Sequence, residues 1–239
     1  MSVNKLSEAI GVGRISTGRA VASASRVLAV LLALVATPSI LCTNGFAASR
    51  LVLDDFTSGP YSKTLKVIGA SDLHYEPLAA GSPLGAARQT DFSLGPNPYN
   101  QSNTLSIGKG VFVVDTAVGA VTAISIGYGQ TLTGVQTPLG LNLGGYSGFQ
   151  LNIAGIATSE SLIVVMTVWP HSGGYFDIEV VLPPSGNPIP EVFPFSSFNQ
   201  GGGGGSLTQS DVSNIDYISI QAQGGGFASF AFTSFEAIE

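Results

Sequence analysis

Residues 161–182 read SLIVVMTVWPHSGGYFDIEVVL, and this stretch decides the fold. An apolar run over 161–169 is followed by a second run over 175–182, and both are rich in Val and Ile. The residues between them, with Pro, Ser and two Gly, are typical of a turn. β-Branched residues in short runs bounded by Gly and Pro favour strands. The stretch therefore predicts two strands joined by a turn.

The same pattern continues outward in both directions. Further apolar or alternating runs occur at 51–56, 64–69, 104–108, 111–117, 120–129, 149–156, 216–222 and 227–238. The sequence SIGKGVF fits a hairpin with Lys109 and Gly110 in its turn. No window after residue 50 has apolar residues at helical spacing over three turns. Many short strands with Gly-rich turns predict an all-β fold, an antiparallel sandwich or barrel.

Three stretches lack a strand pattern, and we expect all of them to be connections inside one domain. Residues 70–103 and 132–148 are expected to be loops, and five consecutive glycines occupy 201–205. A phosphate-binding loop would need a Lys and a helix after the glycines. A domain linker would need more than the two strands that follow. We therefore interpret 201–205 as a connection between strands and 50–239 as a single domain.

The first 49 residues have the pattern of a secretory signal peptide. A basic leader precedes an uncharged run over 27–42, and small residues follow it. A membrane anchor is the alternative, but Pro38 interrupts the run, which is shorter than a spanning helix needs. We predict a cleaved N-terminal signal helix over 1–49 and an exported mature chain. The mature chain would be secreted, periplasmic or at the cell surface, with no membrane span.

Charge and cysteine usage exclude several functions for the predicted mature chain. The nine basic and fifteen acidic residues of the whole chain become five and fourteen without the leader, a net charge of −9. An acidic chain with scattered basic residues does not favour nucleic-acid binding. The one cysteine, Cys42, lies in the leader. The mature chain therefore has no disulfide, no thiol chemistry and no cysteine metal site.

The order of several segments resembles a known family. These segments are LDDFTSG (53–59), GGYSGFQLNIAGIATSESLIVVMTV (144–168), IPEVFPFSSF (189–198), SDVSNIDYISI (210–220) and FAFTSFEAI (230–238). Together they resemble the galactose-binding-like jelly roll of many carbohydrate-binding modules and other exported adhesion domains. A loosely defined group of exported bacterial proteins is also similar, with GAARQTDFSL (85–94) matching a recurrent strand. The resemblance implies a jelly-roll β-sandwich over the whole mature chain.

The resemblance also implies a structural calcium ion between the first and last strands. Asp54, Asp55 and Glu236 occupy the positions that would hold it. Ca²⁺ prefers six to eight hard oxygen ligands, partly from carboxylates. The alternative is that these acids are solvated charges at strand edges. No other cofactor is expected.

Aromatic residues gather in the turn of the opening stretch. Trp169, His171 and Tyr175 lie within VWPHSGGYF. Sugar rings stack on Trp and Tyr, and neighbouring polar groups bind the hydroxyls. These three residues are therefore the candidate ligand site. The alternative is that they cover the end of the core, as Trp and Tyr often do.

Catalytic patterns are weak. The two histidines, His74 and His171, are far apart in sequence, and neither a G-x-S-x-G nor an H-E-x-x-H motif is present. Asp177 and Glu179 alternate with apolar residues, which indicates one solvated face. We predict an exported, non-enzymatic β-sandwich that binds a glycan or another cell-surface component. The alternatives are a structural surface protein without a small ligand and a polysaccharide-acting enzyme.

Overall fold

The computed structural model describes residues 49–158, 160–201, 205–224 and 228–239, so the predicted signal helix lies outside the described residues apart from residue 49. The strands are β1 (Arg50–Asp54), β2 (Tyr61–Leu65), β3 (Ser71–Pro77), β4 (Ala87–Leu94), β5 (Asn103–Gly108), β6 (Val111–Asp115), β7 (Thr122–Gln130), β8 (Gly148–Thr158), β9 (Leu162–Pro170), β10 (Phe176–Leu182), β11 (Ile189–Pro194), β12 (Asn199–Gln200), β13 (Ile215–Gly224) and β14 (Ala228–Ile238). The 3₁₀ turn η1 (Phe195–Ser197) and the one-turn helix α2 (Gln209–Val212) complete the described elements.

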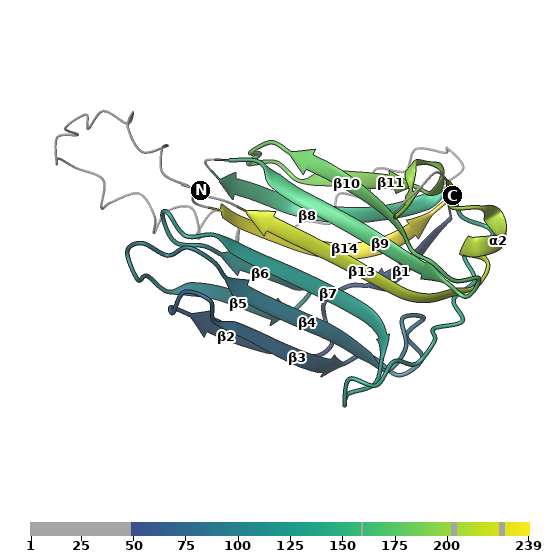
Figure 1. Ribbon diagram of the computed structural model, residues 1–239, viewed down its shortest axis with the longest axis horizontal. Coiled ribbons are helices and arrows are strands. Elements are labelled where there is room, and N and C mark those ends of the chain that lie inside the picture. The colour runs from purple at the N-terminus through teal and green to yellow at the C-terminus, as the bar shows by residue number, and fades with distance from the viewer. Residues whose placement is uncertain (1–48, 159, 202–204, 225–227) are drawn as a thin grey trace, which may run out of the picture. The chain divides into compact units, whose positions relative to one another are not determined.

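These strands form two antiparallel sheets, each of seven strands within the described residues (Figure 1). Sheet A has the order β11-β8-β14-β6-β5-β2, and β1 pairs with β14. Sheet B has the order β12-β10-β9-β13-β7-β4-β3. The prediction of an all-β antiparallel sandwich is confirmed. The two strands of the opening stretch, β9 and β10, pair directly in sheet B.

The core lies between the two sheets and is rich in aromatic rings. Phe149 and Phe235 have ring centroids 5.2 Å apart, and Phe112 stacks on Phe232 at 5.6 Å. All four side chains are fully buried. Strand alternation sends every second residue into this layer, which leaves the intervening residues on the outer faces of the sheets. The outer faces are therefore where a ligand could bind.

The expectation of a loop over 70–103 is wrong, because β3 and β4 lie within it. The inward positions of β4 are Arg88, Thr90, Phe92 and Leu94, all buried. Polar residues therefore occupy half of the inward positions of this strand, and the apolar alternation that marks the other strands is lost.

The predicted hairpin at Lys109 is present: Gly108 pairs with Val111, and Lys109 has φ 55°.

Two smaller features complete the described fold. Helix α2 begins with a capping box, in which the Thr208 and Asp211 side chains each accept a hydrogen bond from the other residue's backbone N–H. Of the glycine run, Gly201 and Gly205 are described; Gln200 N–H donates to the Gly205 carbonyl at 2.8 Å, and Ser206 forms a bridge with Asn199. None of the described helices has the length and apolar character to cross a membrane.

Candidate functional site

The outer face of sheet B carries one row of polar residues across five strands. Asp177 of β10 lies opposite Thr167 of β9, which lies opposite Ser219 of β13. Ser219 lies opposite Gly127 of β7, which lies opposite Gln89 of β4. Cross-strand partners share a face, so the side chains of Asp177, Thr167 and Ser219 form one line. Gln89 continues the row beyond Gly127, which has no side chain. We call this surface, with the adjoining row from Glu179 to Asp91, the outer face of sheet B.

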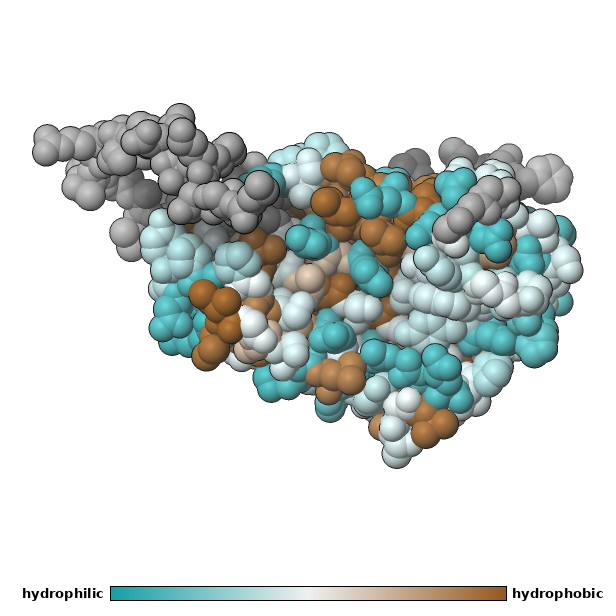
Figure 2. All heavy atoms as spheres, viewed as in Figure 1, coloured by the Kyte–Doolittle hydropathy of each residue, from teal (hydrophilic) through white to brown (hydrophobic). Residues whose placement is uncertain are grey.

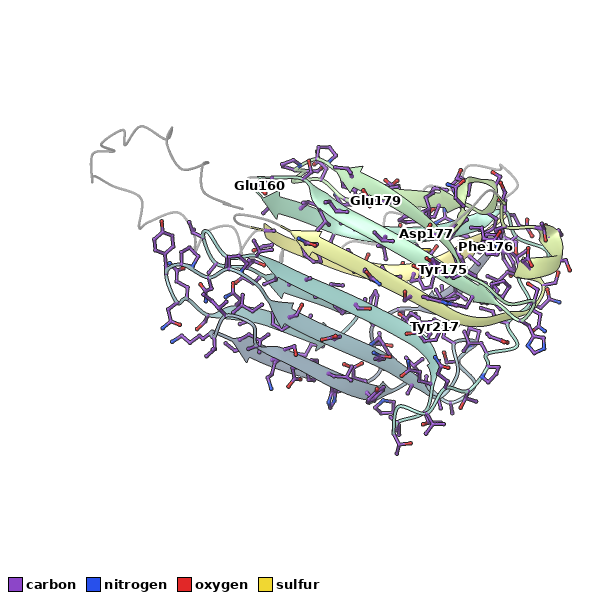
Figure 3. The ribbon with its side chains drawn as sticks, viewed as in Figure 1. Glu160, Tyr175, Phe176, Asp177, Glu179 and Tyr217 are labelled. Carbon is purple, nitrogen blue, oxygen red and sulfur yellow. The ribbon has the colours of Figure 1, made fainter. Side chains whose placement is uncertain are left out.

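Three aromatic rings stand at one end of this face. The Trp169 and Tyr217 ring centroids are 4.9 Å apart in an edge-to-face arrangement. The Trp169 and Tyr175 centroids are 6.1 Å apart. Figure 3 labels Tyr175 and Tyr217 near the ends of β10 and β13, with Asp177 and Glu179 along β10. Trp169, near the end of β9, contacts both tyrosines and is the centre of this cluster.

Tyr217 can lie flat across β7 because two glycines leave room for it. A Cβ atom at Gly127 would overlap the Tyr217 hydroxyl, and one at Gly129 would lie 3.2 Å from the ring carbon Cδ2. The Tyr217 hydroxyl accepts a hydrogen bond from Gln130 Nε2 at 3.4 Å. Burial raises the pKa of Tyr217, so this hydroxyl stays protonated. The two glycines of GYGQ (127–130) in β7 therefore let the Tyr217 ring lie against the strand.

Tyr175 is supported in a similar way by the start of the glycine run. A Cβ atom at Gly201 would overlap the Tyr175 ring, and Gly201 N–H donates to the Tyr175 carbonyl at 3.1 Å. Tyr175 remains 41% exposed. Gly201 therefore holds an exposed ring in place beside Trp169.

An open hollow of about 570 Å³ adjoins the aromatic rings. Its floor includes Ser125, Ser219 and Gln221, and its walls include Trp169, His171 and Asp216. Figure 2 shows polar residues over much of this side of the sandwich and apolar ones over β9 and β10. Those two strands carry the exposed cross-strand pair Ile163 and Val181. The hollow itself has aromatic and polar lining, and the exposed apolar pair lies at the end of β9 far from Trp169.

Several oxygen atoms on and beside this face have no hydrogen-bond partner among the described residues, although they are buried. They are Gln89 Oε1, Asp91 Oδ1, Gln130 Oε1, Asp216 Oδ1 and Ser219 Oγ. Ser219 is only 3% exposed and lines the hollow. Burial, with a smaller contribution from the charge of Asp72, raises the pKa of Asp91. A buried acceptor without a donor costs free energy, so these atoms favour a ligand or ordered water that donates hydrogen bonds.

The outer face of sheet A differs, because its polar side chains bond to one another. Gln150 Nε2 donates to Asn152 Oδ1 at 2.7 Å. Asn152 Nδ2 donates to Ser234 Oγ at 2.7 Å and to Glu236 Oε1 at 2.8 Å. Arg50 forms an ion pair of 3.5 Å with Glu236 Oε2. We call these side chains the ladder of sheet A. They form hydrogen bonds with one another through most of their polar atoms, so few of those atoms are available to a ligand.

The structure brings the three predicted ligand residues to one place. Trp169 and Tyr175 are in ring contact, and His171 lies at the rim, with Nδ1 3.0 Å from Asp216 Oδ2. Sequence reasoning missed Tyr217 and Ser219. Their signal was the alternation in YISIQAQ (217–223), where every second residue is polar or aromatic and faces outward. Sequence reasoning also missed Gln89 and Asp91: the pattern of residues gave no strand there, and the resemblance that matched 85–94 to a strand assigned no site residue to it.

The three predicted calcium ligands have separate partners. Asp54 Oδ2 lies 2.8 Å from Arg88 Nη1, and its Oδ1 accepts from Phe56 N–H at 2.8 Å. Asp55 is exposed and accepts from Thr57 N–H, while Glu236 belongs to the ladder of sheet A. Among the described residues, no three His, Cys, Asp or Glu side chains form a group that could hold a metal. The three acids therefore do not fit one ligand set, and no step below depends on calcium.

Asp54 instead belongs to a buried charge cluster centred on Arg88, which is 0% exposed. Arg88 Nε lies 3.2 Å from Glu76 Oε2, and Nη2 donates to the Ser58 and Gly59 carbonyls. The remaining donors to the two acids are Tyr128, which reaches Asp54 Oδ2 at 2.9 Å, and Thr90, which reaches Glu76 Oε2 at 2.9 Å. The cluster links β1, β3, β4 and β7 inside the sandwich.

Burial raises the pKa of Glu76 to about 7, although Arg88 acts in the opposite direction. Arg88 lies closer to Asp54 than to Glu76, so much of its charge is already offset. Glu76 Oε1 has no hydrogen-bond partner among the described residues. Arg88 and Asp54 therefore form the closer ion pair of the cluster. With a pKa of about 7, the Glu76 carboxyl is partly protonated near neutral pH.

Comparisons with known proteins give structural likeness only. No family model matches the chain, and no curated protein matches it. Among solved structures, it is similar to the Family 11 carbohydrate-binding module of the cellulosomal cellulase Lic26A-Cel5E of Clostridium thermocellum, at 12% identity and a TM-score of 0.39, covering 80% of this chain and 95% of that one.

The same module in complex with a β-1,3-1,4-mixed-linked tetrasaccharide matches at 13% identity and a TM-score of 0.39, covering 80% of this chain and 96% of that one. The enzymatically active domain of tailspike protein 4 of bacteriophage CBA120 matches at 10% identity and a TM-score of 0.33, over 73% of this chain and 20% of that one. Because the TM-scores lie below 0.5, the geometry of the site carries the functional argument.

Proposed function

We propose that the outer face of sheet B binds a glycan and that the protein is a binding module. The observation that carries this proposal is the combination of three adjacent aromatic rings with buried, unpartnered oxygen atoms on one face. Sugar rings have both surfaces that this combination requires: apolar C–H faces and a rim of hydroxyl groups.

The aromatic part of the site is prepared for stacking. Gly127 and Gly201 leave room for the Tyr217 and Tyr175 rings to lie close to the backbone, and Trp169 contacts both rings. A site whose rings are already held in place loses little side-chain entropy when a ligand binds. This arrangement supports recognition of the flat face of a sugar.

The polar part of the site has buried oxygen atoms that lack partners among the described residues. Asp91 Oδ1 and Asp216 Oδ1 are carboxylate oxygens and can only accept hydrogen bonds when ionised, and Ser219 Oγ is free to do either. Hydroxyl groups of a sugar donate readily. The ladder on sheet A pairs most of its own atoms and leaves Glu236 Oε2 without a hydrogen bond among the described residues, so the same ligand has fewer unfilled positions on that face.

We assign the carboxylates of β10 to binding and not to hydrolysis. Asp177 and Glu179 are two positions apart on one strand, a separation of roughly 7 Å. Glycoside hydrolysis uses one carboxyl group that an apolar environment keeps protonated. Glu179 is exposed, which is a poor environment for that role.

We also propose that the protein works outside the cytoplasm. The basic leader, the short apolar run and the small residues before residue 50 support export. N-terminal sequencing of protein recovered from the cell envelope and medium tests this: a mature end near residue 48 or 50 supports it. Recovery of the intact leader in the cytosol alone would contradict it.

The binding proposal is tested on a glycan array and then by calorimetry with any glycan retained, using Tyr175→Ala and Tyr217→Ala. Each of the two substitutions should weaken binding about three- to tenfold, since an aromatic contact contributes about 0.5–1.5 kcal/mol. Tyr99→Ala is the matched control, because Tyr99 is an exposed Tyr at 65% that is outside the outer face of sheet B. Absence of any glycan binding, or equal losses in Tyr99→Ala, would overturn the proposal. Release of shortened sugar products would contradict the non-enzymatic part.

A further inference from the structure

The outer face of sheet B has an excess of negative charge. Asp91, Asp177 and Glu179 lie on the face, and Asp216 lines the hollow beside His171. The five Lys and Arg residues of the described chain lie elsewhere, at positions 50, 63, 66, 88 and 109. They belong to β1, to β2 and the turn after it, to the buried cluster and to the hairpin between β5 and β6. Among the described residues, no Lys or Arg side chain compensates the face; His171 lies at its rim, 3.0 Å from Asp216 Oδ2.

Two of these acids present buried oxygens that lack donors among the described residues. Asp91 Oδ1 and Asp216 Oδ1 are both in this state, and so is Ser219 Oγ on β13, the strand that carries Asp216. Removing a carboxylate from water is costly unless a cation or several donors compensate it. An ammonium group supplies both, since it carries a positive charge and three N–H donors.

The aromatic rings favour the same group. An ammonium near the face of Trp or Tyr is attracted to the ring by about 0.5–2 kcal/mol. Asp177 follows Tyr175 by two residues, and its cross-strand partner Thr167 precedes Trp169 by two residues. Acids and rings together therefore select positive charge and repel carboxylated or sulfated sugars.

We infer that the preferred ligand is an amine-bearing glycan, a chain of amino sugars with free ammonium groups. This inference rests on the proposed glycan-binding function. The acids lie at two edges of the face: Asp177 and Glu179 on β10, and Asp91 on β4, four strand spacings away. At about 4.8 Å per spacing this is roughly 19 Å. A single sugar cannot reach both edges, so an oligomer that crosses the strands is required.

The test is calorimetric titration of the protein with four oligosaccharides of equal length, at a pH where sugar amines are protonated. They are a glucosamine oligomer, its fully N-acetylated form, a neutral glucose oligomer and a uronic-acid oligomer. The glucosamine oligomer should bind at least about tenfold more tightly than the N-acetylated form at low salt. The advantage should nearly vanish at about 1 M salt, where the Debye length is ~3 Å. The uronic-acid oligomer should bind worst.

The double variant Asp177→Asn with Glu179→Gln should remove most of the preference for the amine form over the neutral oligomer. Asp115→Asn is the matched control: Asp115 is an exposed acid of sheet A that accepts from Ser229 Oγ at 2.6 Å. If the neutral or N-acetylated oligomer binds as well as the amine form, the inference fails and the proposed function stands. If none of the four binds and the array is also empty, both fail.

Discussion

Strand β4 carries polar side chains on both of its faces, and the two sets differ in how they are satisfied. On the inner face, Arg88 and Thr90 are fully buried and bond to Asp54 and Glu76. On the outer face, Gln89 Oε1 and Asp91 Oδ1 are buried without a partner among the described residues. The inner polar atoms stabilise the sandwich, whereas the outer ones contribute nothing until a donor arrives. Glu76 Oε1 is the exception on the inner face, since it also lacks a partner among the described residues. The comparison teaches that unfilled hydrogen-bonding capacity on an outer face, rather than polarity alone, marks the proposed binding surface.

The largest expected effect is on the inner face. Arg88→Met leaves Asp54 and Glu76 buried without their cation, which should lower the free energy of unfolding by about 3–5 kcal/mol. Urea denaturation measures this loss. Lys66→Met is the control, since Lys66 is exposed and should change stability by less than about 0.5 kcal/mol. Equal stability of the two variants would mean that the inner cluster is not structural.

Glu76 should make stability depend on pH. Its pKa is about 7 in the folded protein and near 4.5 when unfolded, so the folded state holds a proton that the unfolded chain releases. Stability should therefore be highest below about pH 4.5 for this group and fall as pH rises through 7. Each pH unit between the two pKa values is worth about 1.4 kcal/mol, which gives a loss of roughly 3 kcal/mol.

Glu76→Gln should flatten this decline in a series of thermal melts, because Gln keeps an acceptor for Arg88 and Thr90 and does not ionise. An Asp91→Asn series is the matched comparison on the outer face; a smaller change in slope is expected there, because Asp91 is less buried. A wild-type slope that survives in Glu76→Gln would assign the pH dependence to another group.

The smallest effects distinguish the two faces most cleanly. Thr90→Val on the inner face removes a donor from Glu76 and should cost about 1–2 kcal/mol of stability. Ser219→Ala on the outer face removes a hydroxyl with no partner among the described residues and should leave stability unchanged or slightly higher. Affinity for the ligand should fall a few-fold in Ser219→Ala and stay unchanged in Thr90→Val. Similar losses of stability in both variants would remove the distinction.

The alternation of apolar residues was enough to predict most strands and the antiparallel sandwich. It failed at β3 and β4 because Glu76, Arg88 and Thr90 occupy inward positions and imitate a surface pattern. Such a cluster is stabilised by partners distant in sequence, such as Asp54, which no local pattern shows.

The site was predicted in part for a similar reason. Trp169, His171 and Tyr175 lie in one turn and could be read together, while Tyr217 comes from β13. Its contact with Trp169 depends on the pairing of β13 with β9, and its orientation depends on the glycines of β7. Register between distant strands is a property of the whole sheet and cannot be read from one segment.

Trp169 allows the most direct test, because it is the one tryptophan of the chain and stands at the centre of the proposed site. Its fluorescence should change saturably when the unmodified protein is titrated with a glycan that calorimetry shows to bind, with the same dissociation constant by both methods. The change should persist in Tyr99→Ala and weaken in Tyr217→Ala. A glycan that binds by calorimetry while Trp169 fluorescence stays constant would show that the ligand occupies another surface, and would contradict the assignment of the outer face of sheet B.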